Sequence, residues 1–322
     1  MGVQLDSLIE TIRLKKYFTT AKGTLHAVDD ISLQIRRGET LGIVGESGCG
    51  KSTLGRVMIH LLESTGGKIF FEGKDITHVN KRELHEINEN MQIIFQDPYS
   101  SLNPRQTIEE TVMEPLQISG RYRNKHELIE RTKDLMALVG IDKRLRMAYP
   151  HELDGGRRQR VGIARALSLE PRFIVCDEPV SALDVSIQSQ ILNLLQDLQD
   201  QHGLTYMFIT HDLSVVRHIS DHICVMYLGQ IVEKSPARDL FKQALHPYSK
   251  ALISAIPSID IRNRKERIHL KGEITSPINP KPGCRFMSRC IYAKDSCAED
   301  QVLCEILPNH FVACSRAVEI NS

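Results

Sequence analysis

The hydrophobic pattern of this chain predicts both strands and helices. Short apolar or β-rich runs predict strands at 27–35, 40–44, 67–71 and 173–176. Apolar residues spaced three and four apart predict helices at 52–62, 108–116, 126–139 and 161–167. Because the helical pattern of the middle of the chain interrupts a β-rich pattern, we expect an α/β fold with a helical insertion.

One glycine-rich segment lies between the predicted strand at 40–44 and the predicted helix at 52–62. It fits the phosphate-loop pattern G-x-x-x-x-G-K-[ST], in which backbone N–H groups wrap phosphates, Lys51 meets the β- and γ-phosphates and Ser52 reaches Mg²⁺. A chance glycine-rich turn is the alternative, and the strand–loop–helix context argues against it. The candidate residues are Gly45, Glu46, Ser47, Gly48, Cys49, Gly50, Lys51, Ser52 and Thr53.

Five further motifs follow in fixed order, and together they resemble the ATP-binding cassette (ABC) ATPases. They are 94–97 with Gln96, 153–157 with Asp154, Gly155 and Gly156, 173–178 with Asp177 and Glu178, 181–184 with Asp184, and 208–212 with His211. The resemblance implies a P-loop NTPase (RecA-like) core that binds ATP and Mg²⁺. In that family the motif at 94–97 is called the Q-loop, that at 153–157 the signature and that at 173–178 the Walker B motif. The motif at 181–184 is the D-loop, and the one at 208–212 contains the switch histidine.

The resemblance also implies a role for each polar residue. Asp177 and Gln96 would hold Mg²⁺, Glu178 would act as general base on the attacking water, and His211 would contact the γ-phosphate. A histidine after an apolar strand is also a common turn residue. Phe18 occupies the place of the adenine-stacking ring, with Tyr17 and simple core packing as alternatives.

The chain departs from the family at its signature, where Asp154 replaces the usual serine and Arg157 replaces the usual glutamine. An ionised aspartate cannot donate a hydrogen bond to the γ-phosphate on the other subunit of an ATP-bound dimer. Two interpretations stay open: a weakened ATP site, or a tolerated variant whose charge Arg157 or Arg158 offsets.

Two longer stretches, 96–104 and 246–257, resemble the oligopeptide/dipeptide and nickel importer ATPases. Within that family, the segments 97–102 and 48–54 look more like the F-type than the D-type paralogue. The resemblance implies an importer with two membrane permeases, an external solute-binding protein and a second, paralogous ATPase that pairs with this one. The chain would then work as a peripheral protein on the cytoplasmic face of the membrane. A cassette ATPase acting on nucleic acid or ribosomes is the alternative.

Composition limits these possibilities. The 322 residues are 41% hydrophobic and 25% charged with a net charge of +1, which is ordinary for a globular protein and offers no basic field for nucleic acid. No apolar run approaches the ~20 residues needed to cross a bilayer, and we expect no signal peptide. The motifs predict an ABC ATPase domain at 1–240, with a helical subdomain at about 97–160, and a C-terminal extension at 241–322.

Cysteines concentrate in that extension. Cys49, Cys176 and Cys224 read as buried, reduced core residues, whereas five others lie within 31 residues. A reduced compartment favours metal ligation over disulfides. The resemblance implies a [4Fe-4S] cluster on Cys284, Cys290, Cys297 and Cys314, with Cys304 left over; zinc and no metal are the alternatives. We expect this site and the phosphate loop to belong to separate parts of the chain.

Overall fold

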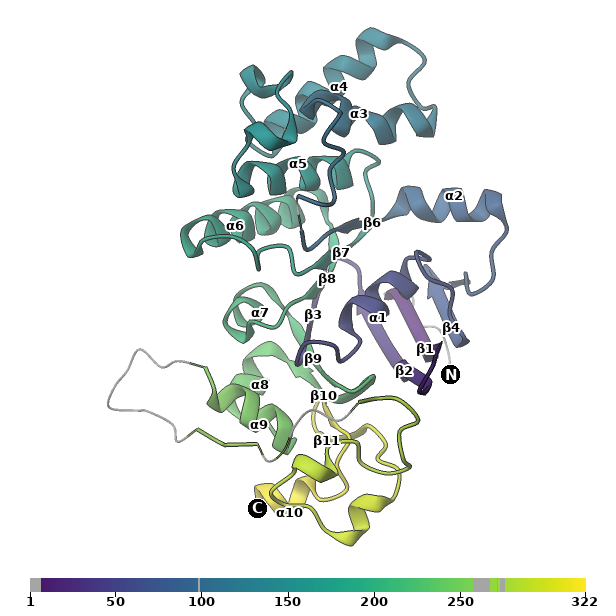
Figure 1. Cartoon of the computed structure of the whole chain (residues 1–322), viewed down its shortest axis with the longest axis vertical. Helices are drawn as coiled ribbons and strands as arrows, with labels where there is room; N and C mark the ends of the chain where they lie inside the picture. Colours follow the sequence, from purple (N-terminus) through teal and green to yellow (C-terminus); the bar gives the residue numbers. More distant parts are fainter. Residues whose placement is uncertain (1–6, 98, 257–266, 271, 273–275) are drawn as a thin grey trace. The chain divides into compact units, whose positions relative to one another are not determined.

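The computed structural model describes residues 7–97, 99–256, 267–270, 272 and 276–322 (Figure 1). The chain forms two compact units. The first comprises residues 1–35, 39–77 and 208–322, within the described ranges, and the second comprises 36–38 and 78–207. The chain passes from the second unit into the first within β8 (Thr205–Ile209).

The first unit contains two β-structures. One is an antiparallel sheet with the order β2-β1-β4-β5, and the other runs β11-β12-β10-β9-β3. Their bounds are β1 (Ser7–Thr20), β2 (Gly23–Arg36), β3 (Thr40–Val44), β4 (Gly66–Phe71), β5 (Lys74–Asp75), β9 (His222–Tyr227), β10 (Gln230–Pro236), β11 (Cys304–Leu307) and β12 (His310–Val312). The predicted strands at 27–35, 40–44 and 67–71 are confirmed.

Strand β3 carries the phosphate loop at its carboxyl end. All five of its residues are buried, and it pairs in parallel with β9, so that Leu41 lies opposite His222 and Val44 opposite Val225. A strand covered on both faces reads as a continuous apolar run. Helix α1 (Lys51–Met58) follows the loop and ends before the predicted 62, because His60 takes a left-handed backbone (φ 59°).

The second unit combines two short strands with several helices. Its strands β6 (Met91–Ile94) and β7 (Phe173–Asp177) pair in parallel. Its helices are α2 (Lys81–Asn90), α3 (Ile108–Ser119), α4 (Lys125–Leu138), α5 (Gly155–Leu167) and α6 (Val185–His202), with 3₁₀ turns at Lys143–Leu145 and Pro150–Glu152. The helices predicted at 108–116, 126–139 and 161–167 are confirmed. Thr107 caps α3 by accepting from the Glu110 amide, which fixes where that helix begins.

The C-terminal residues extend the fold of the first unit. Helices α7 (Leu213–Ile219), α8 (Ala237–Lys242) and α9 (Pro247–Ser254) precede the extension's 3₁₀ turns at Met287–Arg289 and Asp295–Ala298, its strands β11 and β12, and α10 (Ala317–Asn321). Strand β12 pairs with β10. The buried Glu233 carboxylate accepts from the Leu245 and His246 amides and lies 2.6 Å from Nε2 of His310. This polar cluster fastens the extension to β10.

Candidate nucleotide-binding site

The phosphate loop of the first unit is closed around the ammonium group of Lys51. Its Nζ donates to the carbonyl oxygens of Gly45 (2.8 Å) and Glu46 (3.0 Å), and the residue is 5% exposed. The loop's own carbonyl oxygens thus accept two hydrogen bonds from the ammonium. The Lys51 ammonium therefore lies within the loop. Lys51 is the first residue of α1, and the amino end of this helix adds N–H groups that suit an anion.

Glycine is required at two points of this loop. Gly50 has φ 106°, and a Cβ atom there would lie 1.9 Å from the carbonyl oxygen of Ala27. A Cβ atom on Gly45 would lie 2.1 Å from the carbonyl oxygen of Met226. Both obstacles are backbone atoms, which cannot turn aside as a side chain could. The loop therefore packs its backbone directly on β2 and β9, which fits the close approach to phosphate that the sequence predicts.

The two candidate adenine-stacking rings differ in their surroundings. The Tyr17 ring stacks on His26 with centroids 4.0 Å apart, and its hydroxyl donates to Asp29. Phe18 is half-buried, and the Lys16 ammonium lies 5.0 Å from the centroid of its ring. Because Tyr17 already has partners on ring and hydroxyl, Phe18 is the better candidate for stacking on a base.

His211 is exposed and lies between β8 and α7. The Thr210 amide before it donates to the carbonyl of Ile43 on β3 (3.2 Å), and Asp212 after it caps α7 by accepting from the Ser214 amide (2.8 Å). The histidine is thus held by its neighbours at the carboxyl end of β8, beside the strand that leads into the phosphate loop.

In the second unit, two predicted catalytic residues are in contact. Nε2 of Gln96 donates to Oε2 of Glu178 at 2.9 Å, although the residues lie 82 positions apart. Glu178 has φ 48°, an uncommon conformation for a residue with a side chain, and the Ser181 hydroxyl donates to its carbonyl oxygen (3.1 Å). Asp177 ends β7 and is 1% exposed. The carboxylate oxygens of Asp177 are hard ligands of the type that Mg²⁺ takes.

The unusual signature residue Asp154 is the N-cap of α5. One carboxylate oxygen accepts from the Arg157 amide (2.8 Å), and the other lies 3.5 Å from Nε of Arg157. Arg158 points elsewhere: it donates to the Pro150 carbonyl, and its guanidinium lies 3.6 Å from the centroid of the Tyr99 ring. Of the two arginines considered from the sequence, Arg157 is the one that offsets the aspartate.

Three further signature and D-loop residues, Gly155, Gly156 and Asp184, also lie in the second unit. Gly156 is buried in the first turn of α5, and a Cβ atom there would lie 2.6 Å from Cγ2 of Ile187. Gly155 begins α5 next to Leu183, and Asp184 is the residue before α6. The signature and D-loop motifs therefore pack against each other within this unit.

The cysteine prediction has a mixed outcome. Cys49, Cys176 and Cys224 are buried and free, as expected. Within the described residues, no group of three or more His, Cys, Asp or Glu side chains is arranged to hold a metal ion, so the iron–sulfur prediction gains no support from the structure. The Cys284 amide donates to the Cys297 carbonyl oxygen (2.9 Å), while Cys304 is exposed on β11. Burial raises the pKa of Cys284 to about 11.

The extension contacts the phosphate loop, so the expectation that the two belong to separate parts of the chain is wrong. The Arg289 guanidinium donates to both carboxylate oxygens of Glu46 (2.6 and 3.1 Å). The Tyr248 hydroxyl accepts from the Glu46 amide (2.9 Å). Nothing in the sequence signals a pair 243 residues apart. The Arg285 guanidinium, whose side chain is 7% exposed, likewise binds Asp29, a second long-range pair that was not predicted.

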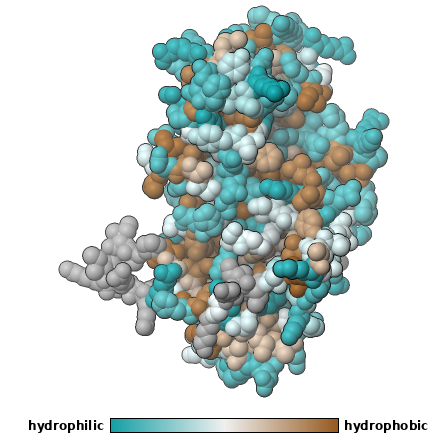
Figure 2. Space-filling model, in the orientation of Figure 1, coloured by the Kyte–Doolittle hydropathy of each residue, from teal (hydrophilic) through white to brown (hydrophobic). Residues whose placement is uncertain are grey.

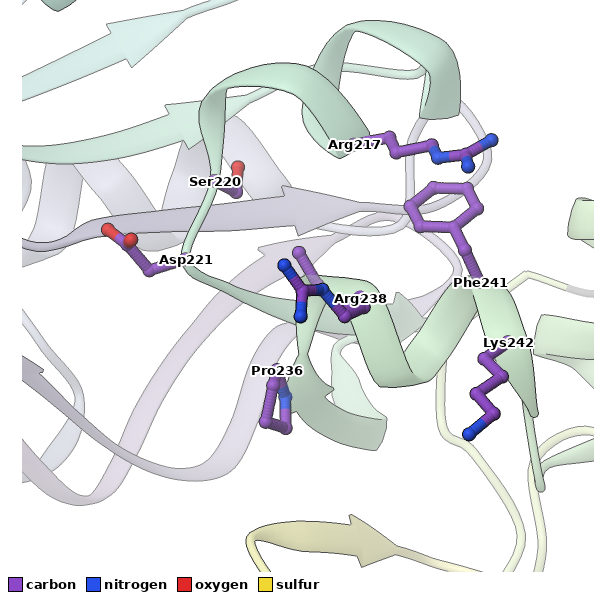
Figure 3. Close-up of a pocket in the computed structure, with 8 residues that line it drawn as sticks. Arg217, Ser220, Asp221, Pro236, Arg238, Phe241 and Lys242 are labelled. Atoms are coloured by element: carbon purple, nitrogen blue, oxygen red, sulfur yellow. The ribbon is translucent and has the colours of Figure 1, made fainter.

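A cavity of about 640 Å³ lies elsewhere in the first unit (Figure 3). Arg217, Phe241 and Arg238 line it together with Lys242 and Asp221, and the Arg217 guanidinium lies 5.4 Å from the centroid of the Phe241 ring. None of the predicted nucleotide-binding residues lines it. The sequence motifs, rather than this cavity, mark the candidate site.

Comparisons with known proteins agree with these motifs. The profile described as "ABC transporter" matches residues 28–181, and that of the "Oligopeptide/dipeptide transporter, C-terminal region" matches 232–297. The putative oligopeptide transport ATP-binding protein YkfD of Bacillus subtilis is 50% identical over 311 residues, covering 95% of this chain and 94% of the relative. This chain belongs to the ABC transporter ATP-binding proteins of the oligopeptide/dipeptide family. Its members are ATPases, and so is this chain.

Further relatives and solved structures support the same family. The oligopeptide transport ATP-binding protein AppF of Bacillus subtilis is 48% identical over 320 residues, covering 96% of this chain and 97% of AppF. A solved dimeric cassette, MJ0796 bound to ADP and Pi, aligns with a TM-score of 0.65 and 28% identity over 71% of this chain and 99% of that one. These matches confirm the predicted α/β cassette fold.

Proposed function

We propose that this chain hydrolyses ATP to drive the import of di- or oligopeptides through membrane permeases. The observation that carries this proposal is the 50% identity over 95% of the chain to a protein named for oligopeptide transport, together with the match to the oligopeptide/dipeptide C-terminal region. None of the helices in the described ranges combines the length and apolar composition that a membrane crossing requires. The transport path would therefore belong to partner subunits.

We assign the chemistry to the two units as follows. In the first, Lys51 and the loop amides bind phosphates, Ser52 binds Mg²⁺, Phe18 stacks on adenine and His211 contacts the γ-phosphate. In the second, Asp177 and Gln96 serve Mg²⁺, and Glu178 takes a proton from the attacking water. Bound Mg²⁺ would neutralise charge on the phosphates. The Gln96–Glu178 hydrogen bond supports this assignment, because an amide donor keeps the carboxylate oriented.

The partners we infer are two permeases, a paralogous ATPase that completes a heterodimer, and indirectly a solute-binding protein, with the chain peripheral to the cytoplasmic face of the membrane. Exposed apolar side chains in the second unit support a docking role: Ile118 is 72% exposed, Met147 69% and Tyr99 62%. Figure 2 shows hydrophobic residues dispersed among hydrophilic ones on the visible face.

The test is uptake by cells that depend on this chain. Membranes are solubilised with the tagged protein, and the permeases should copurify. Lys51→Ala should abolish uptake of labelled di- and oligopeptides while leaving that copurification intact. Nickel uptake that depends on Lys51, without peptide uptake, would replace the peptide proposal with the nickel alternative. A chain that copurifies with ribosomes or nucleic acid and with no permease would contradict both.

We also propose that Cys284, Cys290, Cys297 and Cys314 together bind a metal cofactor through thiolates, with a [4Fe-4S] cluster as the expected group. The hydrogen bond from the Cys284 amide to the Cys297 carbonyl oxygen (2.9 Å) brings two of these residues together, which is the observation that supports the grouping. Anaerobically purified protein should contain about four irons per chain and absorb at about 400 nm. Cys290→Ser should remove both signals, and Cys304→Ser should keep them. Stoichiometric zinc without iron would change the metal, and metal-free protein would refute the proposal.

A further inference from the structure

Glu46, the second residue of the phosphate loop, is held by the C-terminal part of the chain at two points. Its backbone N–H donates to the Tyr248 hydroxyl of α9, and its carboxylate accepts two hydrogen bonds from Arg289 in the extension. Within the phosphate loop itself, the Lys51 ammonium donates to the Glu46 carbonyl oxygen. Backbone and side chain of one loop residue are thus both fixed.

This contact is built into the interior. The Arg289 side chain is 8% exposed and that of Glu46 23%, and the guanidinium also lies 5.9 Å from the centroid of the Tyr227 ring. Phe286, one turn earlier, is buried against Tyr227 and Tyr248. A bidentate arginine–carboxylate pair in such surroundings has a defined geometry and is weakly screened by salt.

The pair also changes the charge that the loop presents. ATP brings three phosphates to a loop that carries a carboxylate at Glu46, and like charges repel. Arg289 neutralises that carboxylate from the side of the extension. Removing the guanidinium would leave a poorly solvated negative charge in the loop, which disfavours an anionic ligand.

From this we propose that the C-terminal extension sets the affinity of the phosphate loop for ATP, with Arg289 acting as a positioning residue through Glu46. The proposal rests on the nucleotide-binding role assigned to the loop above. Arg289 directly precedes Cys290 and follows Cys284 by five residues. The segment that carries it therefore connects two of the grouped thiols to the nucleotide-binding loop.

The experiment is a double-mutant cycle on the full-length chain, with a fluorescent ATP analogue and Mg²⁺ as the probe. Arg289→Met should raise the Kd about tenfold, and Arg289→Lys, which keeps the charge but loses the planar fork, should fall between it and wild type. Glu46→Gln removes the carboxylate. If Arg289 acts through Glu46, then Arg289→Met should have little further effect on Kd in the Glu46→Gln background.

Lys294→Met is the matched control, because Lys294 is an ion-paired cation of the same extension whose partner is Glu319. It should leave the Kd unchanged. Thermal unfolding without nucleotide is measured for every variant, since a purely structural role would lower the Tm of Arg289→Met without the rescue of Kd by Glu46→Gln. In the assembled transporter, Arg289→Met should raise the KM for ATP more than it lowers kcat.

Two results would overturn the inference: an Arg289→Met Kd within about twofold of wild type, or an equal loss of affinity in both Glu46 backgrounds. Lys51→Ala separates this failure from failure of the proposed function. If Lys51→Ala abolishes binding and Arg289→Met does not weaken it, only the role of Arg289 is wrong. If Lys51→Ala binds the probe like wild type, the assignment of the phosphate loop itself is wrong.

Discussion

Replacing Asp154 should separate its structural role from its effect on catalysis. As N-cap of α5, its carboxylate accepts from the Arg157 amide, and losing such a cap costs about 1 kcal/mol. The negative charge at the helix N-terminus adds about 0.5 kcal/mol. The ion pair with Arg157 adds little, because both side chains are more than half exposed. Asp154→Ala should therefore lower the free energy of unfolding by about 1–2 kcal/mol.

Asp154→Ser and Asp154→Asn keep a capping oxygen and should cost no more than about 0.5 kcal/mol. Urea denaturation of the nucleotide-free chain measures all three variants side by side. An alanine variant as stable as wild type would refute the capping argument. A serine variant as unstable as the alanine variant would show that the charge, rather than the cap, stabilises α5.

The catalytic consequence is measured in the complex with the proposed paralogous ATPase. If the carboxylate weakens the ATP site that it completes, the site on this chain's own Lys51 and Glu178 should carry most of the hydrolysis. Mutating Glu178 would then abolish ATP hydrolysis by the complex, while mutating the equivalent glutamate of the paralogue would reduce the hydrolysis rate less. Asp154→Ser should reduce this asymmetry. Equal losses from the two glutamate mutations in the wild-type background would contradict it.

Two further predictions concern stability. Burial lowers the pKa of His246 to about 4, against the opposing attraction of Glu233, and Nδ1 of this histidine accepts from the Tyr248 amide. The unfolded state therefore binds more protons than the folded state between pH 6.5 and 4, so the free energy of unfolding should fall by about 3 kcal/mol as the pH drops through that window. His246→Asn keeps an acceptor for the Tyr248 amide and should flatten this part of the curve of stability against pH. An unchanged slope would refute the assignment to His246. Gly50→Ala should lower the free energy of unfolding by at least about 2 kcal/mol, because its Cβ atom would meet the Ala27 carbonyl. Gly48→Ala is the control: Gly48 has φ 77° but open space around it, and the substitution should cost about 1 kcal/mol in the same unfolding assay. Equal costs would show that the contact with Ala27 is relieved.

The sequence predicted well what depends on neighbouring residues. The phosphate loop lies between β3 and α1 because an apolar run, a glycine pattern and a helical period follow each other directly. Asp154 shows a local signal that was overlooked: an aspartate before a helical run is a common N-cap. The pattern predicted a helix through residue 62, and the left-handed His60 that ends α1 early has no marker in it.

Long-range pairs could not be predicted from spacing. Arg289 meets Glu46, and Arg285 meets Asp29, across more than two hundred residues. Their partners are determined by how the extension packs within the first unit, where Phe286 lies against the Tyr227 and Tyr248 rings. An arginine in a cysteine-rich segment carries no sign of such a partner. The spacing of Gln96 and Glu178 in the sequence also does not predict their contact, and only the resemblance to a family placed both residues in one site.

The most direct test of the central claim is the effect of Glu178→Gln in the transporter assembled with its permeases. The amide keeps the shape of the carboxylate but cannot accept the proton of water, so ATP turnover and peptide uptake should fall together by about 10²–10⁴-fold while ATP binding persists. Trapping of an ATP-bound dimer should accompany the loss. Peptide uptake and ATP turnover at wild-type rates would contradict the assignment of Glu178 and the account of this chain as the ATP-hydrolysing engine of import.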